Sequence, residues 1–165
     1  METGKTEEFK KLHWNFRCKN VLSRCWFISR FLAFKTPLDE RFNDQIPPEH
    51  RFTPDMLFQS MKAHKVKIGL VIDLTNTERF YDKKLMEENE CKYVKLSCRG
   101  HGETPSPDAV KTFVHICKTY IANNPLDIVG VHCTHGFNRL ILISINLDLF
   151  NFELACLIRN WMQQQ

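Results

Sequence analysis

Between residues 28 and 133, short apolar runs alternate with longer stretches in which apolar residues recur at helical spacing. Four of the short runs predict strands, at 30–34, 68–74, 93–96 and in the segment that ends at Cys133. The run at 68–74 is apolar at nearly every position, as is typical of a strand in the middle of a covered parallel sheet. The pattern therefore predicts at least one buried central strand.

Two helices are predicted between these strands, each opened by a capping residue, a proline and an acid. Thr53-Pro54-Asp55 opens a helix to about residue 63, and Ser106-Pro107-Asp108 opens a longer one that ends near Asn123-Asn124-Pro125. The expected inner face of the first helix consists of Met56, Leu57, Ser60 and Met61. The expected inner stripe of the second consists of Val110, Phe113, Val114, Cys117, Tyr120 and Ile121. Alternating strands and helices predict an α/β fold with a central, mostly parallel sheet flanked by helices.

The last predicted strand leads into Cys133, and Arg139 follows after five residues, just before another apolar run. This order predicts a strand, a tight loop and a helix. Such a loop can turn its backbone N–H groups inward to bind an anion, and the helix adds its positive N-terminal end. These groups would stabilise a Cys133 thiolate, while the Arg139 guanidinium would bind two phosphate oxygens.

The spacing of cysteine and arginine is by itself a weak signal. Cys18 and Arg24 have the same spacing, but no strand-like run leads into them and Val21 stands where the loop would need a glycine. Around Cys133 the signal is stronger, because His132 precedes the cysteine and Gly136 lies three residues after it. The phosphate-binding interpretation is therefore favoured over a structural cysteine followed by a surface arginine.

His132-Cys133-x5-Arg139 is the signature of the cysteine-dependent phosphatases, and the string HCTHGFNR resembles the RNA 5′-triphosphatase domain of metazoan mRNA-capping enzymes. Three further stretches resemble the same branch, at 30–38, 72–81 and 100–103. The resemblance covers about residues 28–139, so we expect an N-terminal segment at 1–27 and a cysteine-phosphatase-like domain at 28–165.

The resemblance implies an active site that contains Cys133, Arg139 and Asp73. The phosphate-binding residues that it implies are His132, Thr134, His135, Gly136, Phe137, Asn138 and Arg139. Asp73 has an equally open alternative, a hydrogen bond to its own turn. Glu103 and Asp108 flank the position where related protein phosphatases carry a general acid, although an acid at Asp108 is also favoured by the helix N-terminus.

The implied reaction is attack of Cys133 on the γ-phosphate of RNA, followed by hydrolysis of a phosphocysteine. A β-phosphate is a good leaving group, so a weak general acid favours this substrate over phosphotyrosine. No metal or cofactor is expected, because Arg139 and the loop amides would stabilise the charge. The expected partner is the 5′-triphosphate end of nascent RNA, with a guanylyltransferase or the transcription machinery as further partners, in the nucleus. The chain is expected to be a monomer.

Composition adds few constraints. The 165 residues suit one domain, and the formal net charge of +4 suits a polyanionic substrate without requiring one. Seven cysteines without paired spacing favour a reducing compartment. No signal peptide or membrane span is expected, and hence no membrane partner. Basic and aromatic residues alternate within 1–27. This segment is interpreted either as an arm that binds RNA by stacking or as a segment whose aromatic side chains pack on the domain.

The sequence departs from the family after Arg139. Leu140-Ile141 stands where the family has Thr-Gly, and only 26 residues follow Arg139, enough for one helix to about Asp148 and a second beginning at Asn151. The domain is therefore expected to be incomplete at its C-terminus, and turnover to be impaired. Three hypotheses remain: an RNA 5′-triphosphatase, a dual-specificity or tyrosine protein phosphatase, and a catalytically impaired module that binds phosphate or RNA ends.

Overall fold

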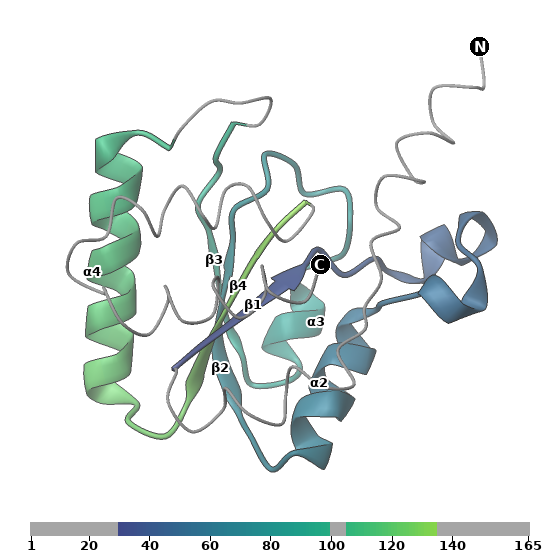
Figure 1. The fold of residues 1–165 in the computed structure, drawn as a ribbon, viewed down its shortest axis with the longest axis horizontal. Helices are drawn as coiled ribbons and strands as arrows, with labels where there is room; N and C mark the ends of the chain where they lie inside the picture. Colours follow the sequence, from purple (N-terminus) through teal and green to yellow (C-terminus); the bar gives the residue numbers. More distant parts are fainter. Residues whose placement is uncertain (1–29, 100–104, 135–165) are drawn as a thin grey trace, which may run out of the picture.

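A computed structural model of the chain describes residues 30–99 and 105–134 (Figure 1). Its described part contains a parallel four-stranded sheet in the order β1-β4-β2-β3. The strands are β1 (Phe31–Lys35), β2 (Ile68–Asp73), β3 (Lys92–Lys95) and β4 (Ile128–Cys133). The predicted fold class and all four predicted strands are confirmed. The apolar residue Leu126 precedes β4 and is not part of the strand, and its side chain is 90% exposed.

Both predicted helices are present with the predicted caps. They are α2 (Pro54–Ala63) and α4 (Pro107–Asn123). The Thr53 side chain accepts a hydrogen bond from the amide of Met56, and the Ser106 side chain accepts one from the amide of Ala109. These bonds satisfy N–H groups that a helix leaves unpaired at its start. Three short elements were not predicted: the 3₁₀ turns η1 (Glu40–Gln45) and η2 (Pro48–His50) and the single-turn helix α3 (Lys84–Glu87).

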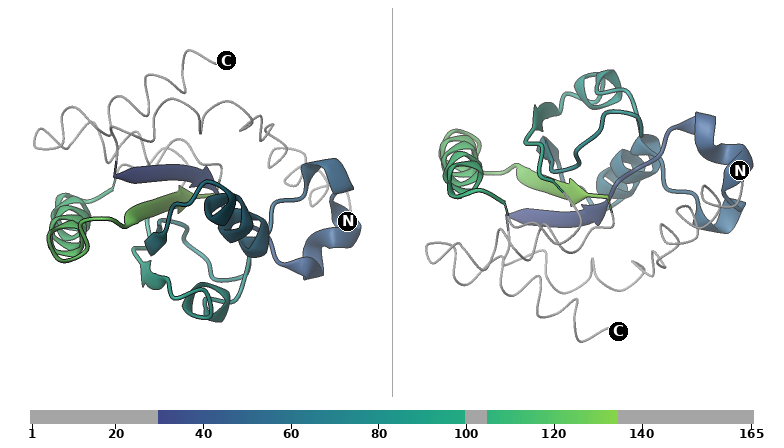
Figure 2. Two further views of the ribbon diagram at one scale, coloured as in Figure 1. Left: turned by 90° about the horizontal axis from the view of Figure 1, so that it is seen from below. Right: turned by 90° about the horizontal axis from the view of Figure 1, so that it is seen from above.

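Figure 2 shows α4 on one side of the sheet and α2 and α3 on the other. An apolar layer lies on each face of the sheet. On one face, α4 covers β2 and β4 with Val110, Phe113, Cys117 and Tyr120, as predicted. On the other face, α2 and α3 contribute Leu57, Met61 and Met86. The prediction that Met56 belongs to this inner face is wrong, because its side chain is 45% exposed. Every residue of β2 and β4 is buried, which places the sheet's centre at these two strands.

The amino ends of the strands are tied together by polar contacts. The Arg30 guanidinium donates hydrogen bonds to the carbonyls of Asn124 and Asp127, just before β4. The Tyr120 hydroxyl donates to the Asp127 carboxylate over 2.7 Å, and Gly69 leaves the room for this pair because a Cβ there would collide with both side chains. These hydrogen bonds hold the amino ends of the strands to the segment that connects α4 and β4.

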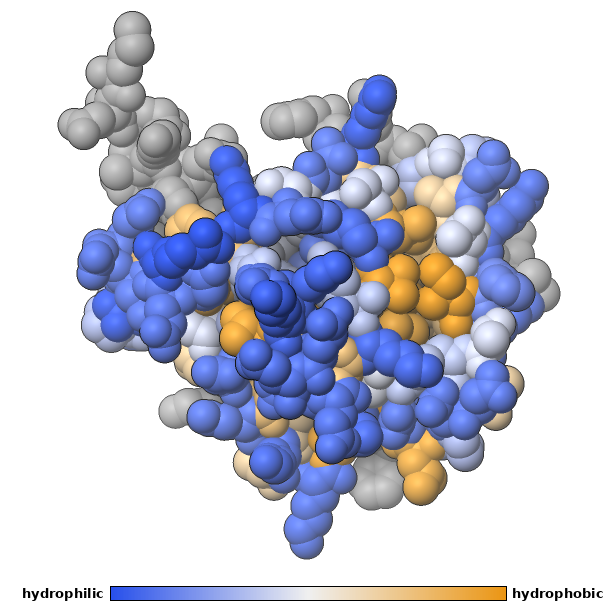
Figure 3. Space-filling model, turned by 180° about the vertical axis from the view of Figure 1, so that it is seen from behind, coloured by the Kyte–Doolittle hydropathy of each residue, from blue (hydrophilic) through white to orange (hydrophobic). Residues whose placement is uncertain are grey.

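The surface on the far side from Figure 1 is largely hydrophilic, with an apolar area beside α4 (Figure 3). No helix in the described ranges is long and apolar enough to span a membrane. The predicted segment 1–27 and both helices expected after Arg139 lie outside the described residues.

Candidate active site

Cys133 is the last residue of β4 and is 2% exposed. Its carbonyl accepts a hydrogen bond of 3.2 Å from the amide of Thr36, the residue after β1. On the other side of β4, Asp73 at the end of β2 is paired in register with His132. Because the strands are parallel, Thr36, Asp73 and Cys133 share the carboxyl edge of the sheet, where ligands bind in open α/β sheets. The sequence correctly placed Asp73 at the same edge as Cys133.

The described residues end one position after Cys133. Thr134 is the first residue of the predicted phosphate loop and is partly exposed. The rest of the predicted loop lies outside the described residues, namely His135, Gly136, Phe137, Asn138 and Arg139. The anion-binding role of this loop and the catalytic role of Cys133 stay predictions.

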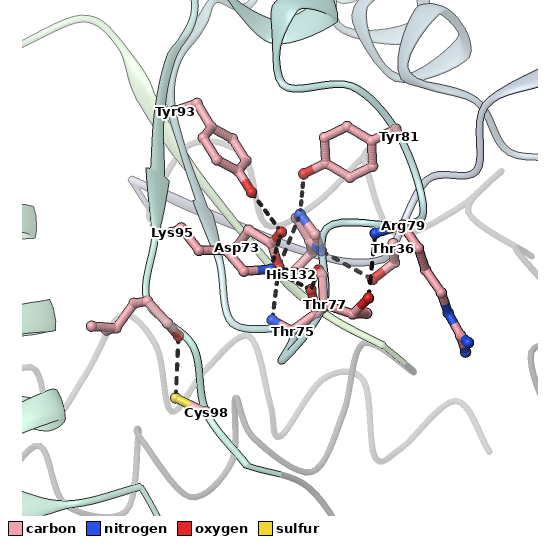
Figure 4. Close-up of polar contacts among 11 residues, drawn as sticks. Thr36, Asp73, Thr75, Thr77, Arg79, Tyr81, Tyr93, Lys95, Cys98 and His132 are labelled. Atoms are coloured by element: carbon pink, nitrogen blue, oxygen red, sulfur yellow. Dashed lines mark hydrogen bonds and ion pairs between the residues drawn. The ribbon is translucent and has the colours of Figure 1, made fainter.

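His132 and Cys133 lie on opposite faces of the sheet, because successive residues of a strand alternate. Cys133 packs in the layer covered by α4, whereas the His132 ring lies between the rings of Phe34 and Tyr81. The ring nitrogens of His132 contact two hydroxyl groups: Nδ1 is 3.1 Å from Thr36 Oγ1, and Nε2 is 2.6 Å from the Tyr81 hydroxyl (Figure 4). These contacts position the backbone that leads into Cys133.

The His132 imidazole is held in its neutral form. It is completely buried, and this burial lowers its pKa to about 4, against the opposing attraction of the Asp73 carboxylate and with a further contribution from the Lys95 charge. A neutral imidazole has one donor and one acceptor nitrogen, and a hydroxyl can pair with either. Thr36 and Tyr81 therefore satisfy both nitrogens without a charge.

Asp73 is the anionic group of this edge. Its carboxylate accepts hydrogen bonds from the Thr75 amide (2.7 Å), the Tyr93 hydroxyl (2.8 Å) and Lys95 Nζ (2.8 Å) (Figure 4). Burial opposes its ionisation, but the nearby His132, the Lys95 ammonium and the hydrogen bonds from Thr75 together lower the pKa of Asp73. With His132 neutral at pH 7, Lys95 supplies the positive charge. The expected bond from Asp73 to its own turn is thus present, and a role in the reaction stays a prediction.

Lys95 ends β3 and points into the same cluster. Besides Asp73, its ammonium donates to Thr75 Oγ1 (2.7 Å) and to the Thr77 carbonyl (2.7 Å). All three of its N–H donors are thus used, one on Asp73 at the end of β2 and two on the turn that follows. No role was predicted for Thr36, Tyr81, Tyr93 or Lys95. The available signal was the position of Lys95 near the end of the strand predicted at 93–96, because position at the end of a strand is the argument that singled out Asp73.

Asp108 lies in the first turn of α4 with 92% of its side chain exposed, 3.7 Å from Lys111. This is the arrangement of a carboxylate that stabilises a helix start. The alternative candidate Glu103 lies outside the described residues. Within the described ranges Cys91, Cys98, Cys117 and Cys133 form no disulfide with one another, and no cluster of three His, Cys, Asp or Glu side chains could hold a metal ion.

The neutral His132 predicts a loss of stability in mild acid. An exposed histidine in the unfolded chain has a pKa near 6.5, whereas the buried ring has one of about 4. As the pH falls from 6.5 to 4, the unfolded state binds a proton that the folded state does not. The free energy of unfolding should therefore be fully retained above pH 6.5 and fall by about 3 kcal/mol by pH 4. Urea unfolding between pH 7.5 and pH 4.5 measures most of this decline.

The matched variant for this measurement is His132→Gln, which retains a donor and an acceptor but cannot titrate. It should be less stable than the parent at pH 7.5 and should lose less stability on acidification. The lowered pKa of Asp73 adds its own loss only at still lower pH, as that carboxylate is protonated. If the free energy of unfolding falls equally with pH in the parent and in the variant, His132 is not the group that causes the loss of stability in acid.

Comparisons with known proteins place this chain among phosphatases. It is 51% identical over 110 residues to the mRNA-capping enzyme of Danio rerio, an alignment that covers 67% of this chain and 18% of the relative. It is 42% identical over 131 residues to the RNA/RNP complex-1-interacting phosphatase homolog of Caenorhabditis elegans, covering 76% of this chain and 56% of the relative. The chain thus spans about a fifth of the capping enzymes and over half of the phosphatase homolog. No protein-family model matches it.

A solved structure supports the same assignment at the level of the fold. A protein tyrosine phosphatase from Leishmania major superposes with a TM-score of 0.52 and 14% identity, covering 82% of this chain and 77% of the other. Its strand-helix architecture is shared with the sheet described above. The chain is thus a homologue of the mRNA-capping enzymes and of the RNA/RNP complex-1-interacting phosphatases, and its fold is that of a protein tyrosine phosphatase.

Proposed function

We propose that this chain is a polynucleotide 5′-phosphatase that removes the γ-phosphate from 5′-triphosphate RNA during mRNA capping. The observation that carries the proposal is the 51% identity over 110 residues to an mRNA-capping enzyme. The buried Cys133 at the carboxyl edge of the sheet supports it, because this is where a nucleophile would meet a ligand.

The proposed reaction has two displacements at phosphorus. The Cys133 thiolate attacks the γ-phosphorus, an S–P bond forms, and the bond to the oxygen that bridges to the β-phosphate breaks, leaving RNA with a 5′-diphosphate. Water then attacks the phosphocysteine, the S–P bond breaks, and inorganic phosphate and the thiolate are released. Arg139 and the loop amides stabilise the charge on the equatorial oxygens in both steps, and no metal or cofactor takes part.

The surroundings of Asp108 support a phosphoanhydride substrate. A phenolate or alkoxide needs a proton from a general acid as it leaves, whereas a β-phosphate does not. Asp108 is almost fully exposed and lies beside Lys111, so its environment is that of a surface carboxylate. The described candidate for a general acid is thus exposed on the surface of α4 and is not enclosed in a pocket of the described residues.

The proposal includes partners and a location. The substrate is the 5′ end of nascent RNA, and the 5′-diphosphate product is what a guanylyltransferase consumes. We place the chain in the nucleus, with this enzyme or the transcription machinery as protein partners and no membrane partner. We propose that it acts as a monomer.

A second candidate is a dual-specificity or tyrosine protein phosphatase that uses the same Cys133 and Arg139. The observation in its favour is that a Caenorhabditis elegans relative, 37% identical over 122 residues, is named a tyrosine-protein phosphatase. A third candidate is a catalytically impaired module that binds phosphate or RNA ends. Leu140-Ile141 favours it, because leucine lacks the hydroxyl of the threonine that the family resemblance places there.

Release of inorganic phosphate from 5′-triphosphate RNA and from a phosphotyrosine peptide tests all three candidates. The experiment uses the full chain and its Cys133→Ser variant, with no added metal and with a chelator present. Release from RNA by the parent chain but not by the Cys133→Ser variant supports the proposal. Release from the peptide but not from RNA supports the protein phosphatase. No release from either substrate by a folded parent, together with binding of 5′-triphosphate RNA, supports the third candidate.

A further inference from the structure

Strand β3 forms one edge of the described sheet. Among the described residues it pairs only with β2, so one side of its backbone has no partner strand there. The amide of Leu96, just after β3, donates to the carbonyl of Asp73 in β2. Because the direction of bonding alternates along a strand, the N–H and C=O groups of Tyr93, Lys95 and Ser97 point away from β2. A further strand would bond to these outward groups.

The two lysines of β3 do not protect this edge. Edge strands of natural proteins are often kept from pairing by lysine side chains, prolines or bulges. Lys95 points into the cluster of Asp73, where only 18% of its side chain is exposed. The ammonium of Lys92 lies over the ring of Tyr120 in α4, 5.6 Å from the ring centroid. Strand β3 contains no proline and no irregularity in its register with β2, so its outer side is able to pair.

An apolar strip lies beside this edge, on the face of the sheet covered by α4. Val94 and Leu96 are only partly buried, and both pack against the apolar layer of that face. Ile116 of α4 is also only partly buried, and it shares one side of the helix with Tyr120, over which Lys92 lies. Figure 3 shows an apolar area on the surface beside α4. We call Val94, Leu96 and Ile116 the β3–α4 strip.

The free edge selects an extended polypeptide as the partner. A strand that adds to β3 forms main-chain hydrogen bonds with the outward N–H and C=O groups. Every second side chain of the added strand then points to the α4 face, where apolar side chains pack on the β3–α4 strip. RNA has no matching row of main-chain donors and acceptors, so the edge favours a peptide over a nucleic acid.

The charge around the β3–α4 strip favours an acidic peptide. Residues 92–99 and 109–123, which border the strip, contain lysine, arginine and histidine but no aspartate or glutamate. Asp108, just before the second range, lies 3.7 Å from Lys111. The acidic residues at 87–90 begin at the end of α3, on the opposite face of the sheet. A second copy of this chain, with its formal net charge of +4, would bring like charges together at the strip.

We propose that the β3 edge binds an extended acidic segment of a partner protein, which adds to the sheet as a strand beside β3. Alternate apolar side chains of the segment pack on the β3–α4 strip, and an acidic side chain on the same face lies beside Lys92. Binding of such a segment does not require a catalytic role for Cys133, so this interaction goes beyond the proposed phosphatase reaction.

Amide hydrogen exchange in the full chain, measured by NMR, tests this mode of binding. The probe is the peptide Glu-Glu-Val-Thr-Val-Thr-Val-Glu-Glu with both ends blocked, which places valines on one face with a glutamate at each end and reads the same in either direction. Saturating peptide should slow exchange of the outward amides of Tyr93, Lys95 and Ser97 at least about tenfold. The inward amides of Val94 and Leu96 should stay within about twofold, because they already bond to β2.

Fluorescence anisotropy of the labelled probe measures the contribution of each part of the surface. Lys92→Glu should weaken binding about fivefold, because repulsion replaces attraction at an exposed position. Ile116→Ser should weaken it by a similar factor, because apolar contact is lost. Lys62→Glu, at an exposed lysine of α2 on the opposite face, is the matched control and should leave the affinity unchanged. A probe with lysine in place of each glutamate should bind at least about tenfold more weakly.

Four outcomes would overturn the proposal. Equal slowing of the outward and inward amides would show contact without addition of a strand. Tighter binding of a single-stranded RNA than of the peptide, weakened by Lys92→Glu, would make this surface a nucleic-acid site. Self-association that protects the outward amides without any peptide would assign the edge to a second copy of this chain. A dissociation constant for the peptide above about 1 mM would show that the edge binds no acidic segment.

Discussion

Replacing Lys95 by methionine is expected to lower the free energy of unfolding by about 3 kcal/mol. The substitution keeps most of the apolar stem and removes only the ammonium. The carboxylate of Asp73, which is 3% exposed in the parent, then loses its cation, and Thr75 Oγ1 and the Thr77 carbonyl lose a donor. Equilibrium unfolding by urea at pH 7 measures the loss.

The size of this effect follows from burial rather than from the attraction between the two charges. An exposed ion pair contributes at most about 1 kcal/mol, but a buried charge left without its partner costs about 3–5 kcal/mol. We expect the lower end of that range, because 18% of the Lys95 side chain is exposed and because the Thr75 amide and the Tyr93 hydroxyl continue to bond Asp73.

A double-mutant cycle separates this cause from a general loss of packing. Combining Lys95→Met with Asp73→Asn removes the uncompensated charge, so the double variant should be more stable than the sum of the two single effects by about 1–3 kcal/mol. Lys83→Met, at an exposed lysine outside the cluster, is the matched control and should change stability by less than about 0.5 kcal/mol. Strict additivity in the cycle would show that Lys95 does not stabilise the Asp73 charge.

The elements that the sequence predicted well are those with strong local signals. The continuous apolar run of β2 is confirmed as a strand buried at every residue, and Thr53 and Ser106 are confirmed as caps because a side-chain acceptor before a proline satisfies the first turn. The helix α3 has four residues and no side-chain cap, so its sequence carries little local signal. Met56 was misplaced because α2 buries a narrower stripe than its apolar residues suggested.

In the candidate site, too, some residues could be predicted from the sequence and others could not. Cys133 and Asp73 could be placed at one edge because each ends an apolar strand, and the carboxyl ends of parallel strands meet. The cluster of Thr36, Tyr81, Tyr93 and Lys95 could not, because it depends on the strand order β1-β4-β2-β3 and on its register. Tyr93 and Lys95 both reach Asp73 only because β3 lies beside β2. Local sequence patterns do not predict the order of strands in a sheet.

Turnover is expected to depend on the two residues after Arg139, whereas the described cluster supports the backbone around Cys133. Replacing Leu140 by threonine and Ile141 by glycine is expected to raise steady-state release of phosphate from 5′-triphosphate RNA about 10- to 100-fold. The family resemblance implies that the threonine hydroxyl bonds the cysteine sulfur as it leaves phosphorus. A hydrogen bond to a charged group contributes about 1.5–3 kcal/mol, and each 1.4 kcal/mol of barrier is a factor of about ten in rate.

The two substitutions should act on different steps. Leu140→Thr alone should speed hydrolysis of the phosphocysteine, seen as a shorter lifetime of the acid-trapped phosphoenzyme. Ile141→Gly alone should tighten phosphate binding, seen as a lower KM, because it removes a β-branched side chain where the family has a glycine that lets the helix start close to the sheet. Leu140→Val is the matched control, since valine has the shape of threonine without the hydroxyl. Equal turnover for the threonine and valine variants would show that the missing hydroxyl does not limit this chain; a gain confined to threonine would place the defect in the departure of the Cys133 thiolate.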